Sequence, residues 1–354
     1  MNSCSFSRFV GALLLSAGLA QAQTTLDLPM TSQAAAVQQR IGVTDITIKY
    51  HRPMVNGRKI WGALVPYGKV WRAGANVNTT IEFSTPVSVE GKPLAAGIYG
   101  LHTIPNTDEW TIIFSKMAVA WGSYTYNEAE DALQVKVKPQ ENASMEEALE
   151  FAFENLKPES VDVTLKWEKL AVPFRVAVTD EETVIPHMRN ELRGYAQYQW
   201  QALNEAAQFC LTKKINLEEG LKWAEQSIQN EERFENVTTK SELLKALNKP
   251  DEAKTTWNHA LEMATAAQLY SYGRQLQGEK RDPESMEIFQ AVAKRFPQDV
   301  YGYLAQARTK SAANDFAGAV EMLKKAIGVS TSEQQKAVLQ GMVEKLNAKQ
   351  DINK

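Results

Sequence analysis

The stretch RPMVNGRKIWGALVPYGKVWRAGANVNTTIEFSTPVSVEGKPLAAGIYGLH, residues 52–102, decides how the first half of this chain folds. It contains seven glycines and four prolines, which exclude a long helix and predict short extended segments joined by turns. Arginine, tryptophan, tyrosine and asparagine lie between these turn residues, and their side chains form flat surfaces that also hydrogen-bond. The stretch therefore predicts strands and loops that carry a candidate binding surface.

That surface is our candidate ligand-binding set, which consists of Arg52, Arg58, Trp61, Tyr67, Trp71, Arg72, Asn76 and His102. In the alternative interpretation the tryptophans fill a core and the arginines close strand ends, because large aromatic side chains are buried more often than they bind ligands. His102 shares a strand face with Ile98 and Ile104. A hydrogen-bonded histidine in the core or at its rim is the alternative to a general base or ligand there.

On both sides of this stretch the apolar residues alternate with polar ones, as they do in half-buried strands. The pattern holds around Ile46–Tyr50, Ile81–Phe83, Trp110–Phe114, Leu133–Val137, Leu149–Phe153, Val161–Trp167 and Phe174–Val178. It predicts about nine short strands in an antiparallel β-sandwich or jelly roll. No long helical segments separate the strands, which disfavours a parallel α/β fold.

Four segments of this half resemble a secreted domain known as domain of unknown function 2911. They are GRKIWGALVPYGKVWRAGAN (57–76), GKPLAAGIYGLHTIP (91–105), DEWTIIFSK (108–116) and, more weakly, VDVTLKWEKLAVPFRVAV (161–178). The resemblance covers about residues 41–178. It implies an exported domain, and because no catalytic motif defines that family, it implies no mechanism.

After Thr179 the hydrophobic period changes to that of helices, and a repeat emerges. The segments LEEGLKWAEQSI (217), PDEAKTTWNHAL (250), DPESMEIFQAVA (282) and FAGAVEMLKKAI (316) align on Gly220, Ala253, Ser285 and Ala319, with spacings of 33, 32 and 34 residues. Twelve residues before these small positions lie Gln208, Ser241, Gly273 and Ala307, where a partner helix must approach closely. This pattern predicts about four degenerate tetratricopeptide repeats.

The helical half has a predicted beginning and end. One apolar stripe from Ile185 to Phe209 predicts a connecting helix, and Ser332 to Leu346 predicts a helix that caps the array. We therefore divide the chain into a signal peptide (1–22), a linker (23–40), a β-sandwich domain (41–180) and a helical tetratricopeptide-like domain (181–354).

The N-terminus reads MNSCSFSRFVGALLLSAGLAQAQ, with a positive Arg8, an apolar run and an A-x-A site that ends at Ala22. This order is typical of a secretory signal peptide cleaved after Ala22, and the run is too short for a membrane helix. Cys4 precedes the apolar run, so it is not placed as a lipid-anchoring cysteine. We expect a protein of the periplasm or the cell exterior without a transmembrane segment.

Composition excludes several classes of function. A formal charge of −3 over 354 residues gives no electrostatic signature of nucleic-acid binding. Cys210 alone remains after the signal peptide, so no intramolecular disulfide forms, and a buried inert thiol is expected. The chain has no HExxH, GxSxG, P-loop, GxGxxG after a strand or paired cysteines. We expect no catalytic residue, metal or cofactor, although the enzyme question stays open.

Two functions follow from these patterns. The first is an exported binding or scaffolding protein whose solenoid holds a protein or peptide partner while the β-sandwich engages a glycan, another small polar ligand or a second protein. The second is a secreted glycan-directed or other hydrolytic enzyme that uses the Arg/Trp/Tyr surface. A glycosidase usually needs two convergent carboxylates, and the sequence identifies no such pair in the β half.

Overall fold

The computed structural model describes residues 29–354, and these fall into two compact units. Unit 1 ends at Val178, and unit 2 runs from Thr179 to Lys354. The predicted signal peptide and the first part of the predicted linker lie outside the described residues.

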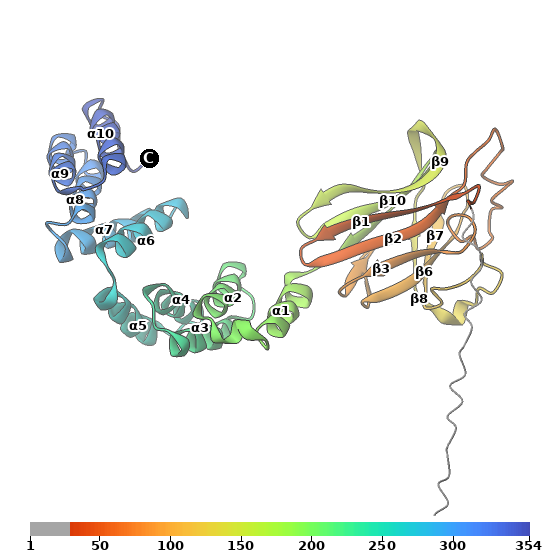
Figure 1. Ribbon diagram of the computed structural model, residues 1–354, viewed down its shortest axis with the longest axis horizontal. Helices are drawn as coiled ribbons and strands as arrows, with labels where there is room; N and C mark the ends of the chain where they lie inside the picture. The colour runs from red at the N-terminus through yellow and green to blue at the C-terminus, as the bar shows by residue number, and fades with distance from the viewer. Residues whose placement is uncertain (1–28) are drawn as a thin grey trace, which may run out of the picture. The chain divides into compact units, whose positions relative to one another are not determined.

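Unit 1 is a sandwich of two antiparallel sheets (Figure 1). The larger sheet has the strand order β1-β2-β3-β6-β7-β8 and the smaller one the order β5-β4-β10-β9. The strands are β1 (Gln33–Ile41), β2 (Thr44–Arg52), β3 (Thr79–Phe83), β4 (Val87–Val89), β5 (Lys92–Leu94), β6 (Gly97–Ile104), β7 (Trp110–Ser115), β8 (Asp131–Val137), β9 (Gln140–Lys157) and β10 (Ser160–Ala177). The predicted antiparallel sandwich is confirmed.

The inner faces of the two sheets share one apolar core, because successive side chains of a strand point to opposite faces. Phe114 of the larger sheet meets Phe174 of the smaller one with 5.8 Å between ring centroids. Tyr50 and Phe151 meet across the sandwich at 5.0 Å. The alternating apolar residues of the sequence therefore face this core.

The strands differ from the predicted ones at two places. Residues 33–40, predicted as linker, belong to β1, which pairs with β2 along its whole length. Backbone hydrogen bonds to β2 hold this edge strand, and its alanines and glutamines show only a weak alternation of apolar and polar residues. The predicted strands at 161–167 and 174–178 are one strand, β10, which ends at Ala177. An irregularity at Glu168, where φ is 57°, shifts the register without ending the strand.

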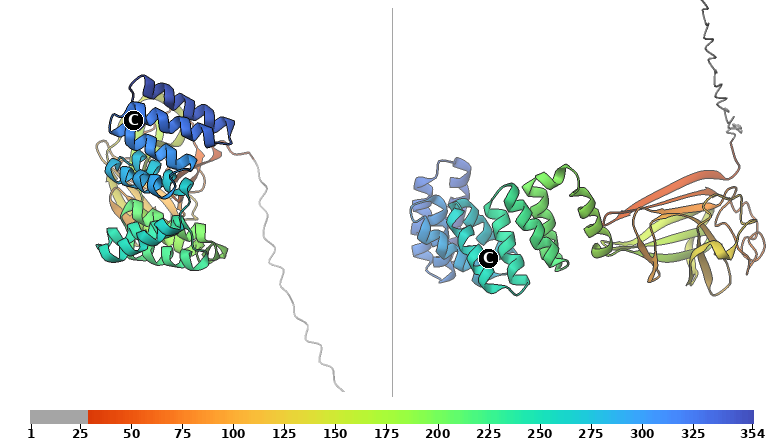
Figure 2. Two further views of the ribbon diagram at one scale, coloured as in Figure 1. Left: turned by 90° about the vertical axis from the view of Figure 1, so that its left-hand side faces the viewer. Right: turned by 90° about the horizontal axis from the view of Figure 1, so that it is seen from below.

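Unit 2 is an array of ten helices, and the colours of Figure 2 show that they follow one another through the stack in chain order. They are α1 (Asp180–Glu191), α2 (Trp200–Lys213), α3 (Leu217–Asn230), α4 (Phe234–Ala246), α5 (Pro250–Met263), α6 (Ala266–Gly278), α7 (Asp282–Arg295), α8 (Val300–Ala312), α9 (Phe316–Val329) and α10 (Glu333–Asn347). The first helices of the four repeats are α2, α4, α6 and α8, and the second helices are α3, α5, α7 and α9.

The small residues of the repeat lie where paired helices touch. A Cβ atom at Gly273 would lie 2.7 Å from the Phe289 ring, and the Ser285 hydroxyl donates to the Gly273 carbonyl at 2.7 Å. One repeat earlier, the Ser241 hydroxyl donates to the Ala253 carbonyl at 2.9 Å. Only small side chains allow this approach, so the predicted repeat spacing is confirmed by the packing.

The prediction is wrong at the beginning of the helical array and confirmed at its end. The predicted single helix from Ile185 to Phe209 is wrong, because a 3-10 turn (Tyr195–Tyr198) separates α1 from α2. The predicted cap is confirmed as α10, whose N-cap Ser332 accepts from the backbone N–H of Gln335. None of the helices within residues 29–354 combines the length and apolar character needed to cross a membrane.

Cys210 of α2 is fully buried, which agrees with the expected inert thiol. Burial raises its pKa to about 11, so little thiolate forms near neutral pH. A Cβ atom at Gly220 of α3 would lie 2.7 Å from the Cys210 Cβ atom. The Cys210 side chain therefore packs between α2 and α3, the two helices of the first repeat.

Candidate functional site

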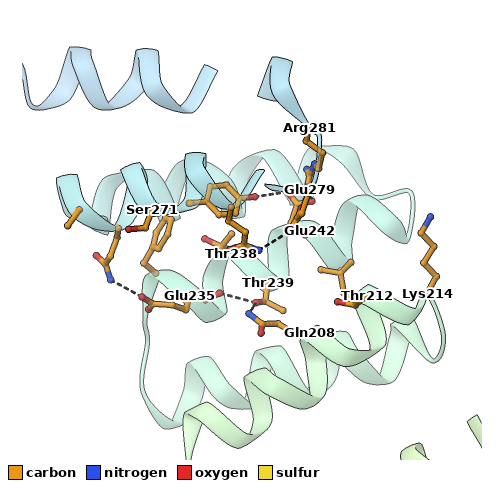
Figure 3. Close-up of a pocket in the computed structure, with 16 residues that line it drawn as sticks. Gln208, Thr212, Lys214, Glu235, Thr238, Thr239, Glu242, Ser271, Glu279 and Arg281 are labelled. Carbon is orange, nitrogen blue, oxygen red and sulfur yellow. Dashed lines mark hydrogen bonds and ion pairs between the residues drawn. The ribbon is translucent and has the colours of Figure 1, made fainter. Parts of the chain in front are cut away.

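A groove with a volume of about 820 Å³ lies on the first helices of three successive repeats (Figure 3). Its polar residues come from α2, α4, α6 and the turns after α2 and α6. They are Gln208, Thr212, Lys214, Glu235, Thr238, Thr239, Glu242, Gln268, Ser271, Gln275, Glu279 and Arg281. Phe234, Leu211 and Tyr272 add apolar surface. This volume lies within the usual range of ligand sites.

Most of the charge in this groove is neutralised internally. Glu242 receives the Arg281 guanidinium at 3.2 Å, the Lys245 ammonium at 2.8 Å and the Tyr272 hydroxyl at 3.3 Å. Burial, and then the neighbouring Glu242 carboxylate, raise the pKa of Tyr272, so its phenol stays protonated and donates. Arg281 also pairs with Glu284, which is the main cause of its raised pKa. The charges at this end of the groove are therefore largely paired with one another.

The other end of the groove has unused hydrogen-bonding and charge capacity. Glu235 accepts from the Gln268 amide at 3.1 Å, and among residues 29–354 it forms no ion pair with a cation. Thr238 is 6% exposed, and its hydroxyl has no hydrogen-bond partner within the described structure. Gln208 and Thr239 bond to each other at 3.3 Å. These groups suit a ligand that brings both a positive charge and polar backbone groups.

The predicted ligand set of unit 1 separates in the structure into residues with different surroundings. Arg52 donates to the Leu149 carbonyl at 2.8 Å and pairs with Glu150 at 3.4 Å. Arg58 donates to the carbonyls of Val55 and Met54. Both guanidinium groups hold neighbouring chain segments in place, as in the alternative interpretation of the sequence.

Trp61 and Trp71 pack against the core with Trp110 and Trp167. Ring centroids lie 5.0 Å apart for Trp61 and Trp110, and Trp71 stacks on Trp167 at 5.9 Å. Trp110 and Trp167 are fully buried, whereas Trp61 and Trp71 are partly buried. Packing explains both predicted tryptophans without a ligand.

Tyr67 and Asn76 lie in the loops between β2 and β3. The Tyr67 ring, 42% exposed, rests against Gly62, where a Cβ atom would lie 2.8 Å from the ring. Asn76 adopts a left-handed conformation with φ of 58°, and its amide donates to the Ser32 carbonyl at 3.2 Å. Asn76 shapes the loop, and Tyr67 keeps an accessible face.

Arg72 and His102 lie together on the outer face of the larger sheet. The bridge between Trp71 and Thr103 is closed by two backbone hydrogen bonds of 2.7 and 2.8 Å, and both residues face the core. In this antiparallel register Arg72 is opposite His102, and their side chains point away from the core. These two members of the predicted set are therefore brought together by the fold.

The loop of residues 116–130, which lies outside the predicted ligand set, covers this outer face. The Ser123 hydroxyl lies 2.9 Å from His102 Nδ1. Asn78, which is 4% exposed, donates to the Ala118 carbonyl at 3.1 Å and accepts from the Ala120 N–H at 2.8 Å. The loop is thus fixed at two places by buried polar side chains.

His102 is 3% exposed, and burial lowers its pKa, while the Asp131 carboxylate partly opposes this effect. A neutral imidazole is therefore the expected form near pH 7. In the structure His102 Nδ1 forms a hydrogen bond with the Ser123 hydroxyl. The sequence signal for this loop is the group of aromatic residues around a glycine and a serine, AWGSYTY (120–126), which does not alternate as a strand does.

Among residues 29–354 no group of three or more histidine, cysteine, aspartate or glutamate side chains is arranged to hold a metal ion.

Residues 32–176 match the model of a family described as protein of unknown function (DUF2911). Among solved structures the chain is similar to one described as the crystal structure of YrrB, a TPR protein with an unusual peptide-binding site. The two are 18% identical with a TM-score of 0.25 over 45% of this chain and 86% of that chain. The curated proteins contain no match.

Proposed function

We propose that this chain is an exported binding or scaffolding protein whose groove on α2, α4 and α6 holds an extended segment of a protein partner, while unit 1 engages a ligand or a second protein. The observation that carries the proposal is the groove itself, which is continuous over three successive repeats. Stacked helical repeats form extended concave surfaces of this kind, and such surfaces suit elongated ligands.

The side chains of the groove support a peptide as the ligand. Amides and hydroxyls, among them Gln208, Gln275 and Ser271, are exposed there and match the donors and acceptors of a peptide backbone. The residues that line the groove include no cysteine or histidine. Glu235, which lacks a cationic partner among the described residues, favours a lysine or arginine in the bound segment.

Ser271→Arg is expected to abolish retention of a partner, because a long charged side chain on α6 fills the groove from an exposed position. The matched control is Gln290→Arg, which adds the same side chain at an exposed position of α7 outside the groove. The measurement is a pull-down from cell envelope with the full chain and with each variant.

Glu235→Gln is expected to weaken retention of the partner in the same pull-down about tenfold, the effect of losing one charge-assisted contact.

Both arginine variants should keep the thermal unfolding midpoint of the wild type, since neither site is buried. A partner that Ser271→Arg retains as well as Gln290→Arg does would show that the groove is not its binding surface. The absence of any envelope protein specific to the wild type would remove the support for the proposal.

Export is proposed from the N-terminal sequence, which has the charged, apolar and A-x-A segments of a signal peptide in order. We expect the protein recovered from the periplasm or the medium to begin at Gln23. N-terminal sequencing measures this directly. A chain that begins at Met1 and stays in the cytosol would refute export, while leaving the peptide-binding proposal to its own test.

A further inference from the structure

Arg72 carries a charge that the described structure does not balance. Its side chain is partly buried, and its Nε atom is shielded from solvent without a hydrogen-bond partner. No carboxylate of residues 29–354 forms an ion pair with it, whereas Arg52 and Arg175 of the same unit pair with Glu150 and Asp162. Burial lowers the pKa of Arg72, which reflects the cost of keeping the cation away from water.

An unpaired, partly buried cation is costly, and it is usually found where a counter-ion binds. The loop that adjoins the Arg72 guanidinium carries exposed aromatic residues. Trp121 is 61% exposed and Tyr124 is 87% exposed, and both belong to the 116–130 loop. A Cβ atom at Gly122, where φ is 72°, would lie 3.0 Å from the Tyr124 ring and 3.7 Å from Arg72 Nη1. The guanidinium and the Tyr124 ring therefore adjoin the same turn.

These aromatic residues are presented by a fixed loop. Asn78 binds the loop backbone before Trp121, and His102 binds Ser123 after it. Val77 and Trp121 also form a backbone bridge. A loop ordered in this way loses less conformational entropy when a ligand binds, so its exposed rings form a prepared apolar surface.

We propose that Arg72 and the 116–130 loop bind a small monocarboxylate that carries an aromatic or apolar group. The inference rests on the part of the proposed function that gives unit 1 a ligand, and it is independent of the groove in unit 2. The planar guanidinium donates two parallel hydrogen bonds to a carboxylate, and Trp121 and Tyr124 cover the apolar part of the ligand.

The acidic residues at the end of the loop interact with other groups than Arg72. Asp131, Glu128 and Glu130 lie at the end of the same loop and at the start of β8. Asp131 accepts from the Tyr126 hydroxyl at 2.6 Å, and its other carboxylate oxygen is buried without a partner. A phosphate has no apolar group to place against Trp121 and Tyr124, whereas an aromatic monocarboxylate offers a carboxylate to Arg72 and a ring to the aromatic side chains.

The test is a calorimetric titration of the full chain with benzoate, with benzamide as the neutral molecule of the same shape and inorganic phosphate as the multiply charged anion. We expect saturable binding of benzoate and at least tenfold weaker binding of the other two. Arg72→Met should weaken benzoate binding at least tenfold and keep or raise the thermal midpoint, because it removes an unbalanced charge and keeps the apolar stem. Trp121→Ala should weaken binding about threefold without a change in midpoint.

Arg58→Met is the matched control, since Arg58 bonds to backbone carbonyls in the same unit, and it should bind benzoate as the wild type does. Ser271→Arg should also bind benzoate normally, which separates this site from the groove. The proposal is overturned if benzoate does not saturate, if Arg72→Met binds it as tightly as the wild type, or if Arg72→Met lowers the midpoint as a structural arginine would.

Discussion

Trp110→Ala is expected to lower the free energy of unfolding of unit 1 by about 3–5 kcal/mol, the usual cost of removing a buried aromatic side chain. Trp110 is fully buried, and its ring lies 5.0 Å from that of Trp61. Its indole N–H has no partner within residues 29–354, so the loss comes from packing rather than from a hydrogen bond. Chemical denaturation followed by tryptophan fluorescence measures the change.

The matched control is Trp121→Ala, which removes the same side chain from a position that is 61% exposed and should change stability by less than about 0.5 kcal/mol. The helical circular dichroism signal should persist in Trp110→Ala after the sandwich unfolds, because the core of unit 1 contains no residue of unit 2. Equal stability losses in the two variants would contradict the assignment of Trp110 to the core.

Arg308→Ala is expected to destabilise unit 2 by about 3 kcal/mol, since the change leaves two buried polar groups without partners. Arg308 of α8 is 2% exposed, donates to the Tyr270 hydroxyl at 2.7 Å and donates to the Ile352 carbonyl at 2.8 Å. Its guanidinium also lies over the rings of Tyr270 and Phe289 at 5.6 Å. Thermal unfolding followed by helical circular dichroism measures the loss.

The chain offers a control one repeat earlier. Arg274 of α6 occupies the same repeat position and is exposed. Within residues 29–354 its guanidinium forms a hydrogen bond with the Gln277 side chain only. Arg274→Ala should therefore cost less than about 0.5 kcal/mol. Removal of residues 351–354 should reproduce part of the Arg308 effect, because it takes away Ile352 and Asn353, which contact the guanidinium. An Arg308→Ala midpoint equal to that of Arg274→Ala would show that the buried contacts contribute nothing.

The face of its own strand or helix on which a residue lies could be predicted from the sequence. The alternation around Ile46–Tyr50 identified a strand with one buried face, and the recurrence of small residues at Ala253, Ser285 and Ala319 identified helix pairs. Both patterns are local, because the period of a strand or helix determines which side chains share a face. Prediction failed at β1, where exposed alanines and glutamines leave little alternation to detect.

The groove could be predicted as a feature of stacked repeats, but its chemistry could not. Glu242 and Arg281 are 39 residues apart, and their ion pair depends on how the turn after α6 meets the end of α4. The same holds for Arg308 and the C-terminal Ile352, which are 44 residues apart. Such contacts depend on the packing of different elements, which no periodicity within one helix specifies.

The order of a β-rich unit followed by an array of helical repeats is specified locally in the sequence, because hydrophobic periodicity and repeat spacing are properties of each segment alone. Which members of the predicted ligand set lie close together depends on the packing of distant segments. Arg52, Arg58, Trp61 and Trp71 make structural contacts. His102 contacts Ser123, and Arg72 lies beside Gly122, only because strand register and the path of the 116–130 loop bring them to one face. Register and loop path result from burial over the whole sandwich.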